Sequence, residues 1–289
     1  MIYLFLKLFL FLRIGFSQES DQCFKANDLT RVVVAGGSIT EIIYFLNLDE
    51  HLIAVDVTSN YPPNAKDLPS LGYVRNLSTE GILSLNPTLI LGENDMGPPI
   101  VIEQLRSTEI DFRIIAEEHS AKGILEKMYC IGDIFDLQKK EIKKMTADLN
   151  KNVTQLSKII DSGTLKSTNV MFVLNFRGNS PIVAGKGTSG DGFISMIGCQ
   201  NAFNEIEGWK AISEESVLNV NPDYIIMPNK SIHRGSGIET IKNNPIIMNT
   251  TAGKDENFIF KDAMAMIGFG PRTIKIAIEI AELISEQNQ

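Results

Sequence analysis

The sequence predicts an α/β protein of two similar lobes, each with a central parallel sheet, joined by a long rigid helix. Short apolar strands alternate with helical segments in both halves of the chain, which is typical of mostly parallel sheets. A helical stretch of about 40 residues lies between the two series. A phrase of ten residues also occurs twice, 135 residues apart. An offset near half the chain indicates two related lobes, because a solenoid repeats every few tens of residues.

The chain begins with a nearly unbroken apolar run that contains Lys7 and Arg13. A run this short at the start of a chain is more typical of a secretory signal peptide than of a membrane span. We therefore expect residues 1–17 to be a signal peptide; an uncleaved anchor is the alternative.

Charge excludes one broad class of function. The sequence has 289 residues, 44% of them hydrophobic, which is ample for a large core. Without residues 1–17 it has 25 Lys and Arg against 35 Asp and Glu, a net charge of −10. A nucleic-acid binder needs a basic surface to displace counterions, so we expect no nucleic-acid partner.

The three cysteines, Cys23, Cys130 and Cys199, are far apart and form no C-x-x-C motif. This spacing does not indicate a zinc site or a redox pair. We expect isolated buried thiols. A single disulfide in an oxidising compartment is the alternative, and the sequence does not specify its pairing.

The first lobe is expected over residues 24–120. Residues 31–35 are a β-branched run that predicts a buried parallel strand. Gly36 and Gly37 then make a turn, Ser38 is placed to cap the next helix, and Glu41 completes a capping-box pattern. The turn lacks the third glycine of a dinucleotide-binding fingerprint, so we interpret it as structural. Further strands are expected within residues 51–59, 87–94 and 112–118.

The connecting segment is expected over residues 121–163. Residues 121–160 have helical periodicity, contain no proline, and would span roughly 60 Å as one helix. The second lobe follows over residues 164–289. Its expected strands lie within residues 169–176, 180–184, 222–229 and 257–262, and residues 270–287 form an amphipathic helix with Pro271 in its first turn.

The repeated phrase covers residues 78–87 and 213–222. Serine, glutamate, an aliphatic pair, asparagine and proline coincide in the two copies, and each copy continues into an apolar strand. The phrase predicts a short helix, a proline stop and a strand at the same point in each lobe.

Several motifs together resemble a known family. They are "RVVVAGGSITEIIYFLNL", "DVTSNYP", "LPSLGYVRNLSTEGILSLNPTLIL", "SPIVAGKGTSGD", "SVLNVNPDYII" and "IGFGPRT", and they span residues 31–275. The chain is similar to substrate-binding proteins of bacterial ABC importers whose two α/β lobes are joined by one rigid helix. Those proteins handle vitamin B12, ferric siderophores or haem. The "GYVR" motif and the late "GFGPR" resemble the haem branch.

The resemblance implies a haem carrier of the periplasm with a ligand cleft between its lobes. Its partners would be haem, an ABC transporter permease and, further out, an outer-membrane haem receptor system. A carrier for a corrinoid or a ferric siderophore is the alternative within the same class. A periplasmic enzyme is a second alternative, but Ser38 lacks a G-x-S-x-G elbow and no histidine is evident as its base.

Haem requires an axial iron ligand, apolar walls and partners for two carboxylates, and tyrosine is a known haem ligand. The resemblance places the ligand at Tyr73, where Gly72 leaves room and Arg75 would stabilise the phenolate. An ordinary loop aromatic is the alternative for Tyr73. Tyr61 is interpreted as a wall or packing residue.

The opposite side of the cleft is expected from the second lobe. Lys186 lies between two glycines at a helix entrance. The resemblance implies a histidine ligand from this lobe in some relatives, whereas the lysine here is a candidate propionate partner. Arg234 is a second candidate cation, and its neighbour His233 is the one histidine considered as an axial ligand. Solvated surface charge is the alternative for both cations. His51 is expected beside a helix end and His119 in an exposed charged loop, so these scattered histidines do not predict a zinc site.

Glu80 and Glu215 occupy the same position in the two copies of the repeated phrase. The resemblance implies that one glutamate on each lobe docks with arginines of the permease, a role that gives steering and register. The alternative is a favourable interaction with the dipole of the helix that each one begins.

Overall fold

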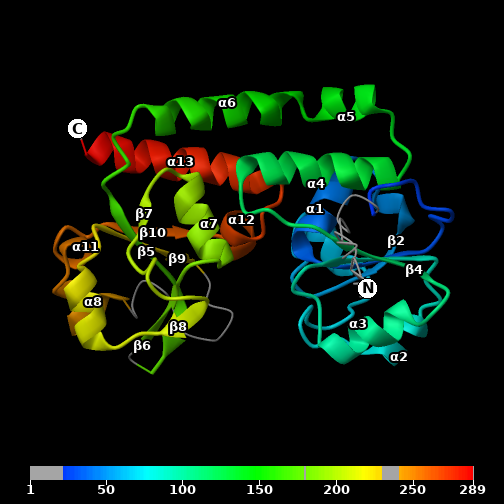
Figure 1. The fold of residues 1–289 in the computed structure, drawn as a ribbon, viewed down its shortest axis with the longest axis horizontal. Coiled ribbons are helices and arrows are strands. Elements are labelled where there is room, and N and C mark those ends of the chain that lie inside the picture. Colours follow the sequence, from blue (N-terminus) through cyan, green and yellow to red (C-terminus); the bar gives the residue numbers. More distant parts are fainter. Residues whose placement is uncertain (1–21, 179, 230–240, 289) are drawn as a thin grey trace, which may run out of the picture.

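The computed structural model describes residues 22–178, 180–229 and 241–288. Two α/β lobes lie side by side, and helices run along one edge of both (Figure 1). The expected signal peptide, residues 1–17, lies outside the described residues. Within the described ranges, no helix is long and apolar enough to cross a membrane.

The first lobe has the expected parallel sheet, and its strands occur in the order β2-β1-β3-β4. Alternate residues of β1 face opposite sides: Val32 and Val34 pack with α1 and α4, whereas Val33 and Ala35 pack with α2 and α3. The strands are therefore buried on both faces, as parallel strands usually are. The bounds are β1 Val32–Ala35, α1 Gly37–Phe45, η1 Asp49–His51, β2 Leu52–Val55, η2 Pro63–Asp67, α2 Thr79–Leu83, β3 Leu89–Glu93, α3 Pro99–Arg106 and β4 Asp111–Ile115.

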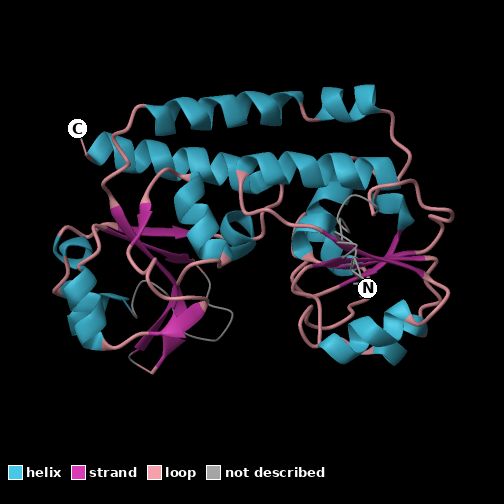
Figure 2. Ribbon diagram, viewed as in Figure 1, coloured by secondary structure: helices cyan, strands magenta, loops and turns pink. Residues whose placement is uncertain are grey.

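The second lobe also has a central sheet, and Figure 2 shows the strands of both lobes in magenta. This second sheet is mixed, with the order β10-β9-β5-β6-β8 and with β7 paired to β5. The prediction of parallel pairing holds for β5, β7, β9 and β10. It is wrong for β6, which pairs antiparallel with both of its neighbours, β5 and β8. The reason is local: β5 turns through Gly178, at φ 59°, into β6, and strands joined by a tight hairpin run antiparallel. The bounds are β5 Asn169–Arg177, β6 Ser180–Ala184, α7 Ser189–Met196, β7 Gln200–Asn201, β8 Trp209–Ala211, α8 Glu214–Val220, β9 Tyr224–Pro228, α10 Pro245–Met248, α11 Thr251–Lys254, β10 Phe258–Lys261, α12 Ala263–Ile267 and α13 Pro271–Gln287.

The connecting segment is helical, but the single long helix expected there is instead three: α4 Ala121–Ile134, α5 Lys139–Met145 and α6 Ala147–Asp161. The first break lies where Asp136 takes a left-handed φ of 62° and the Leu137 amide bonds back to the Gly132 carbonyl. This turn brings Ile142 of α5 against Gly132, where a larger residue would collide with it. The chain therefore folds back, and α6 lies alongside α13 at the edge of the molecule (Figure 1).

One hydrophobic cluster joins the two lobes. It contains residues of β1 and β3 from the first sheet, residues of β5 and β9 from the second, and the buried faces of α4 and α13. Because this cluster is continuous from lobe to lobe, the lobes share a core and are not linked by a bare hinge.

Glu41 forms a buried contact between the lobes rather than the expected capping box. Its carboxylate accepts hydrogen bonds from the Arg272 backbone amide and from Arg272 Nε, both at 2.8 Å. The Arg272 guanidinium also lies 3.8 Å from the centre of the Tyr61 ring. Ser38 is not the helix cap either: Gly36 takes that place, and Ser38 is the second residue of α1.

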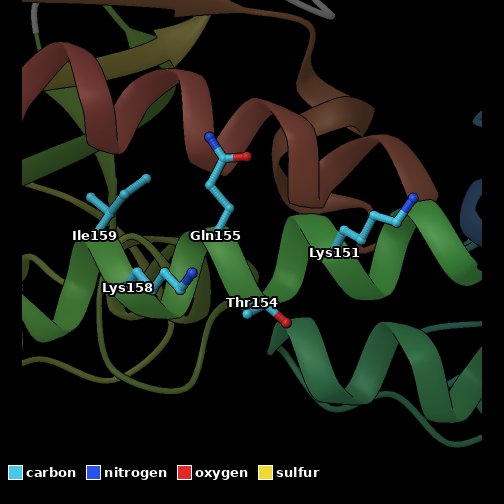
Figure 3. A pocket seen from close by; sticks show the side chains of 5 residues that line it. All are labelled: Lys151, Thr154, Gln155, Lys158 and Ile159. Carbon is cyan, nitrogen blue, oxygen red and sulfur yellow. The ribbon is translucent and has the colours of Figure 1, made fainter.

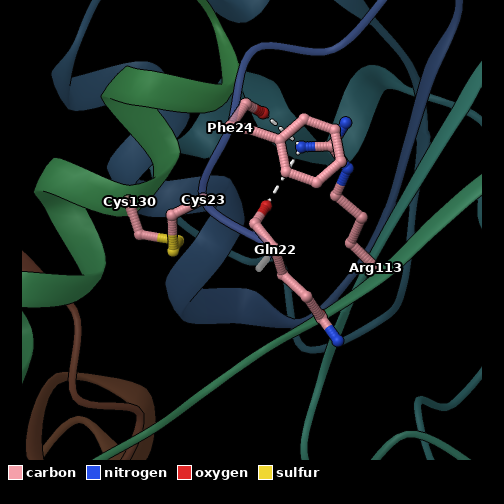
Figure 4. Close-up of a disulfide and its surroundings, with 5 residues drawn as sticks. All are labelled: Gln22, Cys23, Phe24, Arg113 and Cys130. Carbon is pink, nitrogen blue, oxygen red and sulfur yellow. Dashed lines mark hydrogen bonds between the residues drawn. A yellow bond between two sulfur atoms is a disulfide. The ribbon is translucent and has the colours of Figure 1, made fainter. Parts of the chain in front are cut away.

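The first described residues are attached to the first lobe by a disulfide between Cys23 and Cys130 (Figure 4). The expectation of isolated thiols is therefore wrong for this pair and holds for Cys199, which is free. Arg113 adds to the attachment, because its Nη1 donates to the carbonyls of Gln22 and Phe24. The spacing of the cysteines did not indicate this pairing, because 107 residues separate the two.

Thiol counting tests this pairing. Burial, followed by the nearby charge of Asp223, raises the pKa of the Cys199 thiol to about 12, so the folded protein should react slowly with a thiol reagent near neutral pH. Unfolded without reductant, the protein should show one thiol; unfolded with reductant, it should show all three. Three thiols in the unreduced, exported protein would contradict the disulfide.

Candidate functional site

A cleft of about 490 Å³ lies between the lobes, and both of them line it. Its size is in the range of small-molecule and cofactor sites. The first lobe contributes mostly polar side chains. They come from the loop after β2, from the end of β3 and the residues after it, and from the loop after β4. The second lobe contributes an apolar wall made of Leu174, Trp209, Met264 and Ile267.

Tyr73 lines this cleft from the loop after β2. Gly72 takes φ 87° with nothing within 4 Å of the space for a side chain, so the turn is open at this point. The loop is fixed by hydrogen bonds from the Val57 amide to the Gly72 carbonyl and from the Asn76 amide to the Tyr73 carbonyl, at 2.9 and 2.7 Å. The Tyr73 side chain is 43% exposed although its neighbour Val74 is buried. A fixed backbone therefore presents an accessible phenol to the cleft.

Arg75 also lines the cleft, but its charge is engaged. Its Nε and Nη2 lie 2.8 and 2.7 Å from Asp95 Oδ2. Asp95 is itself a cleft residue, so the pair adds no net charge to the lining.

Two other residues predicted for the site, Tyr61 and Lys186, are described and are not in this lining. Tyr61 packs beneath Arg272, which agrees with a packing role. Lys186 is exposed beside the cleft residue Gly187, but its side chain is not part of the lining. His233 and Arg234 lie outside the described residues. His51 is remote from the cleft, with Nδ1 2.9 Å from the Leu29 carbonyl.

The floor of the cleft holds a chain of polar side chains that sequence reasoning missed. Ser38 Oγ donates to Glu93 Oε1 at 2.5 Å, and Lys127 Nζ donates to Ser38 Oγ at 2.7 Å. Lys127, only 3% exposed, also bonds to Glu117, which lies 3.1 Å from His119 Nε2. The five residues come from α1, β3, α4 and the loop after β4, so no local pattern links them. The available signal was that Glu93 ends β3 and Glu117 lies just after β4, at the carboxyl ends of parallel strands where α/β sheets place their ligands.

His119 was expected in an exposed loop, and this expectation is wrong. Its ring stacks on Phe269, with the ring centres 4.7 Å apart, and it lines the cleft. A side chain at Gly192 of α7 would collide with it, so His119 also packs against the second lobe. The charged neighbours in the sequence suggested an exposed loop, but Glu117 is partly buried beside His119 while Glu118 is exposed.

Burial controls the charges on the cleft floor. Burial, followed by the negative charge of Glu117, raises the pKa of Glu93 to about 8. Burial alone would also raise the pKa of Glu117, but the ammonium of Lys127 holds it below its usual value. Glu117 and Lys127 therefore form an ion pair, while Glu93 is largely a neutral acid near pH 7.

The described lining has no unpaired cation. Its charged groups are the pair Arg75–Asp95, the pair of Glu117 with Lys127 behind it, and Glu93. No group of three or more His, Cys, Asp or Glu side chains within the described ranges is placed to hold a metal ion. Direct metal binding by the protein alone therefore has no candidate in these residues.

The repeated phrase forms the same structure twice, as predicted. Ser78 caps α2 and Ser213 caps α8, each accepting from the amide three residues later. Asn86 and Asn221 both take a left-handed conformation before the proline that precedes the strand. The two helices lie on the side of the molecule away from α6 and α13 (Figure 1). Glu80 and Glu215 are exposed in their first turns.

A second hollow, of about 580 Å³, runs along α6 (Figure 3). All its lining residues belong to this one helix: Lys151, Thr154, Gln155, Lys158 and Ile159. It lacks convergent groups from separate elements, which binding sites usually have, so the cleft is the candidate site.

Residues 32–265 match the periplasmic binding protein family, and the chain belongs to that family. The uncharacterised ABC transporter substrate-binding lipoprotein YvrC of Bacillus subtilis (strain 168) is 26% identical, covering 88% of this chain and 79% of the relative. The vitamin B12-binding protein of Pectobacterium atrosepticum is 26% identical, covering 68% of this chain and 71% of the relative.

Solved structures of haem-binding proteins share the fold. The periplasmic haem-binding protein BhuT, in complex with two haems, superposes with a TM-score of 0.81 at 27% identity, covering 90% of this chain and 99% of that one. The periplasmic haem-binding protein HutB of Vibrio cholerae has a TM-score of 0.75 at 30% identity, covering 89% and 99%. Fold and family together define a substrate-binding protein of an ABC transporter, which works outside the cytoplasm. The family is one of solute carriers and not of enzymes.

The charge state of Glu93 gives a prediction for the ligand-free protein. The pKa of Glu93 is raised from 4.5 to about 8 in the folded state, so folding takes up a proton at any pH between these two values. The free energy of unfolding therefore falls as the pH rises from 4.5 to 8. The free energy of unfolding of the wild type should fall by roughly 1 kcal/mol per pH unit relative to Glu93→Gln between pH 5 and 8. Urea unfolding at several pH values measures this, and parallel curves would contradict the shift.

Proposed function

We propose that this protein captures haem in the cleft between its lobes and delivers it to an ABC transporter permease from the periplasm. The observation that carries the proposal is Tyr73, an accessible phenol on a fixed turn, facing a cleft with an apolar wall. Haem is a flat apolar ring with a Lewis-acidic iron, and these two features match it. Relatives described as haem-binding proteins share the fold over most of both chains.

Tyr73 would bind the iron as a phenolate. The free phenol has a pKa near 10, so binding at neutral pH requires loss of its proton, and ferric iron favours this because the phenolate is a hard anionic ligand. Arg75 lies two residues away and its field also favours the anion, although Asp95 offsets much of that field.

Substitution of Tyr73 tests the iron ligand. Wild-type protein titrated with haemin should give a shifted and sharpened Soret band. Tyr73→Phe should lose this spectrum and bind haemin at least ten-fold more weakly, because the phenyl ring fills the same space without an oxygen. Tyr61→Phe is the matched control and should behave as wild type, since Tyr61 packs under Arg272 outside the cleft lining. An unchanged spectrum in Tyr73→Phe would contradict haem ligation.

A corrinoid is the second candidate, and the acidic lining favours it. The described lining contains Glu93 but no free cation that could balance a carboxylate on the ligand. A corrinoid has amides along its edge, which suit a neutral acid. A relative described as a vitamin B12-binding protein is also in agreement. A ferric siderophore remains an alternative in the same class.

Competition separates these candidates. Under the haem proposal, a hundred-fold excess of cyanocobalamin should leave the haemin-loaded spectrum unchanged. Tight binding of cyanocobalamin by calorimetry, together with weak haemin binding that Tyr73→Phe does not alter, would transfer the assignment to the corrinoid.

Delivery to the permease is proposed to use Glu80 and Glu215. Both carboxylates are exposed at the start of equivalent helices on one side of the molecule, so a permease with two similar halves could contact both. Such exposed charges affect encounter and register more than stability.

The double variant Glu80→Lys/Glu215→Lys should keep its haemin affinity and lose most haem uptake in reconstituted vesicles. Glu286→Lys, an exposed charge reversal on α13, is the control and should transport as wild type. Normal transport by the double variant would exclude the docking role.

A further inference from the structure

The cleft raises a problem for a ligand with carboxylates. A haem has two of them, but the Arg75 guanidinium in the described lining and the Lys127 ammonium behind it are both engaged by carboxylates of the protein. Lys186 is exposed outside the lining. A ligand carboxylate that reaches the floor would therefore meet Glu93 rather than a free cation.

The geometry of Glu93 leaves one of its two oxygens available. Oε1 accepts from both the Ser38 amide, at 3.0 Å, and the Ser38 hydroxyl, at 2.5 Å. No hydrogen bond within the described ranges involves Oε2, and Glu93 is part of the cleft lining. Gly36 makes this pose possible, because any side chain there would collide with the Glu93 side chain. The carboxyl group is thus held against the start of α1 by one oxygen.

The charges around Glu93 come from four elements. Lys127 of α4 and Glu117 after β4 lie behind it, and His119 follows Glu117 along the same chain of contacts. Asp95, paired with Arg75, is a further negative charge that acts on Glu93. Three carboxylates therefore share two engaged cations. A proton on Glu93 removes the unbalanced charge, and its place is Oε2, because Oε1 is occupied as an acceptor.

We propose that Glu93 contacts the ligand directly and determines specificity by donating a hydrogen bond from Oε2 to a carboxylate on the ligand edge. This inference rests on the proposed function, because the carboxylate it names is a haem propionate. An O–H···O⁻ hydrogen bond is among the stronger ones, so a neutral acid can replace the free cation that the described lining lacks. Ionised Glu93 would instead repel the same carboxylate.

The inference makes affinity depend on pH in a defined direction. The pKa of Glu93, about 8, places the change within reach of a binding assay. Above this pH, haemin affinity should fall by as much as about ten-fold per pH unit, since the required proton is lost. Glutamine donates through its amide at every pH, so Glu93→Gln should remove this dependence.

The experiment measures haemin affinity of the full-length exported protein between pH 6.5 and 9.5. Wild type and Glu93→Gln should agree within a few-fold at pH 7 and diverge above pH 8, where wild type weakens. Glu103→Gln, an exposed change on α3, is the control and should follow wild type. A second ligand, haemin dimethyl ester, has its carboxylates blocked and should bind wild type with no loss of affinity above pH 8. The ester arm keeps the test valid if the variant folds poorly.

The outcomes distinguish this inference from the proposed function. Parallel pH curves for wild type and Glu93→Gln, or the same loss for haemin and its ester, would overturn the role of Glu93 while Tyr73-dependent haemin binding stands. Haemin binding that Tyr73→Phe does not affect would overturn the proposed function itself.

Discussion

The structure depends on the fixed attachment of one lobe to the other. A single hydrophobic cluster runs from the first sheet to the second under α4 and α13. In addition, the buried Glu41 of α1 receives two hydrogen bonds from Arg272 at the start of α13. Separating the lobes would expose apolar surface and leave a buried carboxylate without its partner, and both changes are costly. The cleft is therefore largely preformed, and a rigid flat ligand suits such a site better than a flexible one.

A preformed cleft places the selection of ligand in its lining. The wall from the second lobe is apolar, and the floor from the first lobe is a connected set of polar groups. His119 lies at the junction, because it belongs to the floor and packs against Phe269 and α7. Glu93, the protonated group of the floor, is thus connected through the hydrogen bonds of the floor to His119, which packs between the two lobes.

The sequence predicted the parts that repeat or follow local periodicity. The two lobes, the alternating elements and the repeated phrase at Ser78 and Ser213 follow from local patterns, and all are present. The break of the connecting helix was not predictable, because it depends on Ile142 packing against Gly132 in the folded chain. Tyr73 was identified through a motif and does line the cleft. The floor was missed because Lys127 and Glu117 meet Ser38 and Glu93 only in three dimensions.

The central claim concerns one bond, between the phenolate oxygen of Tyr73 and ferric iron in the cleft. A crystal structure of the protein crystallised with haemin tests it most directly. The account predicts a macrocycle between the turn at Gly72 and the apolar wall at Trp209, with the Tyr73 oxygen within bonding distance of the iron. A macrocycle bound elsewhere, or an iron whose protein ligand is another residue while the Tyr73 ring is turned out of the cleft, would contradict it.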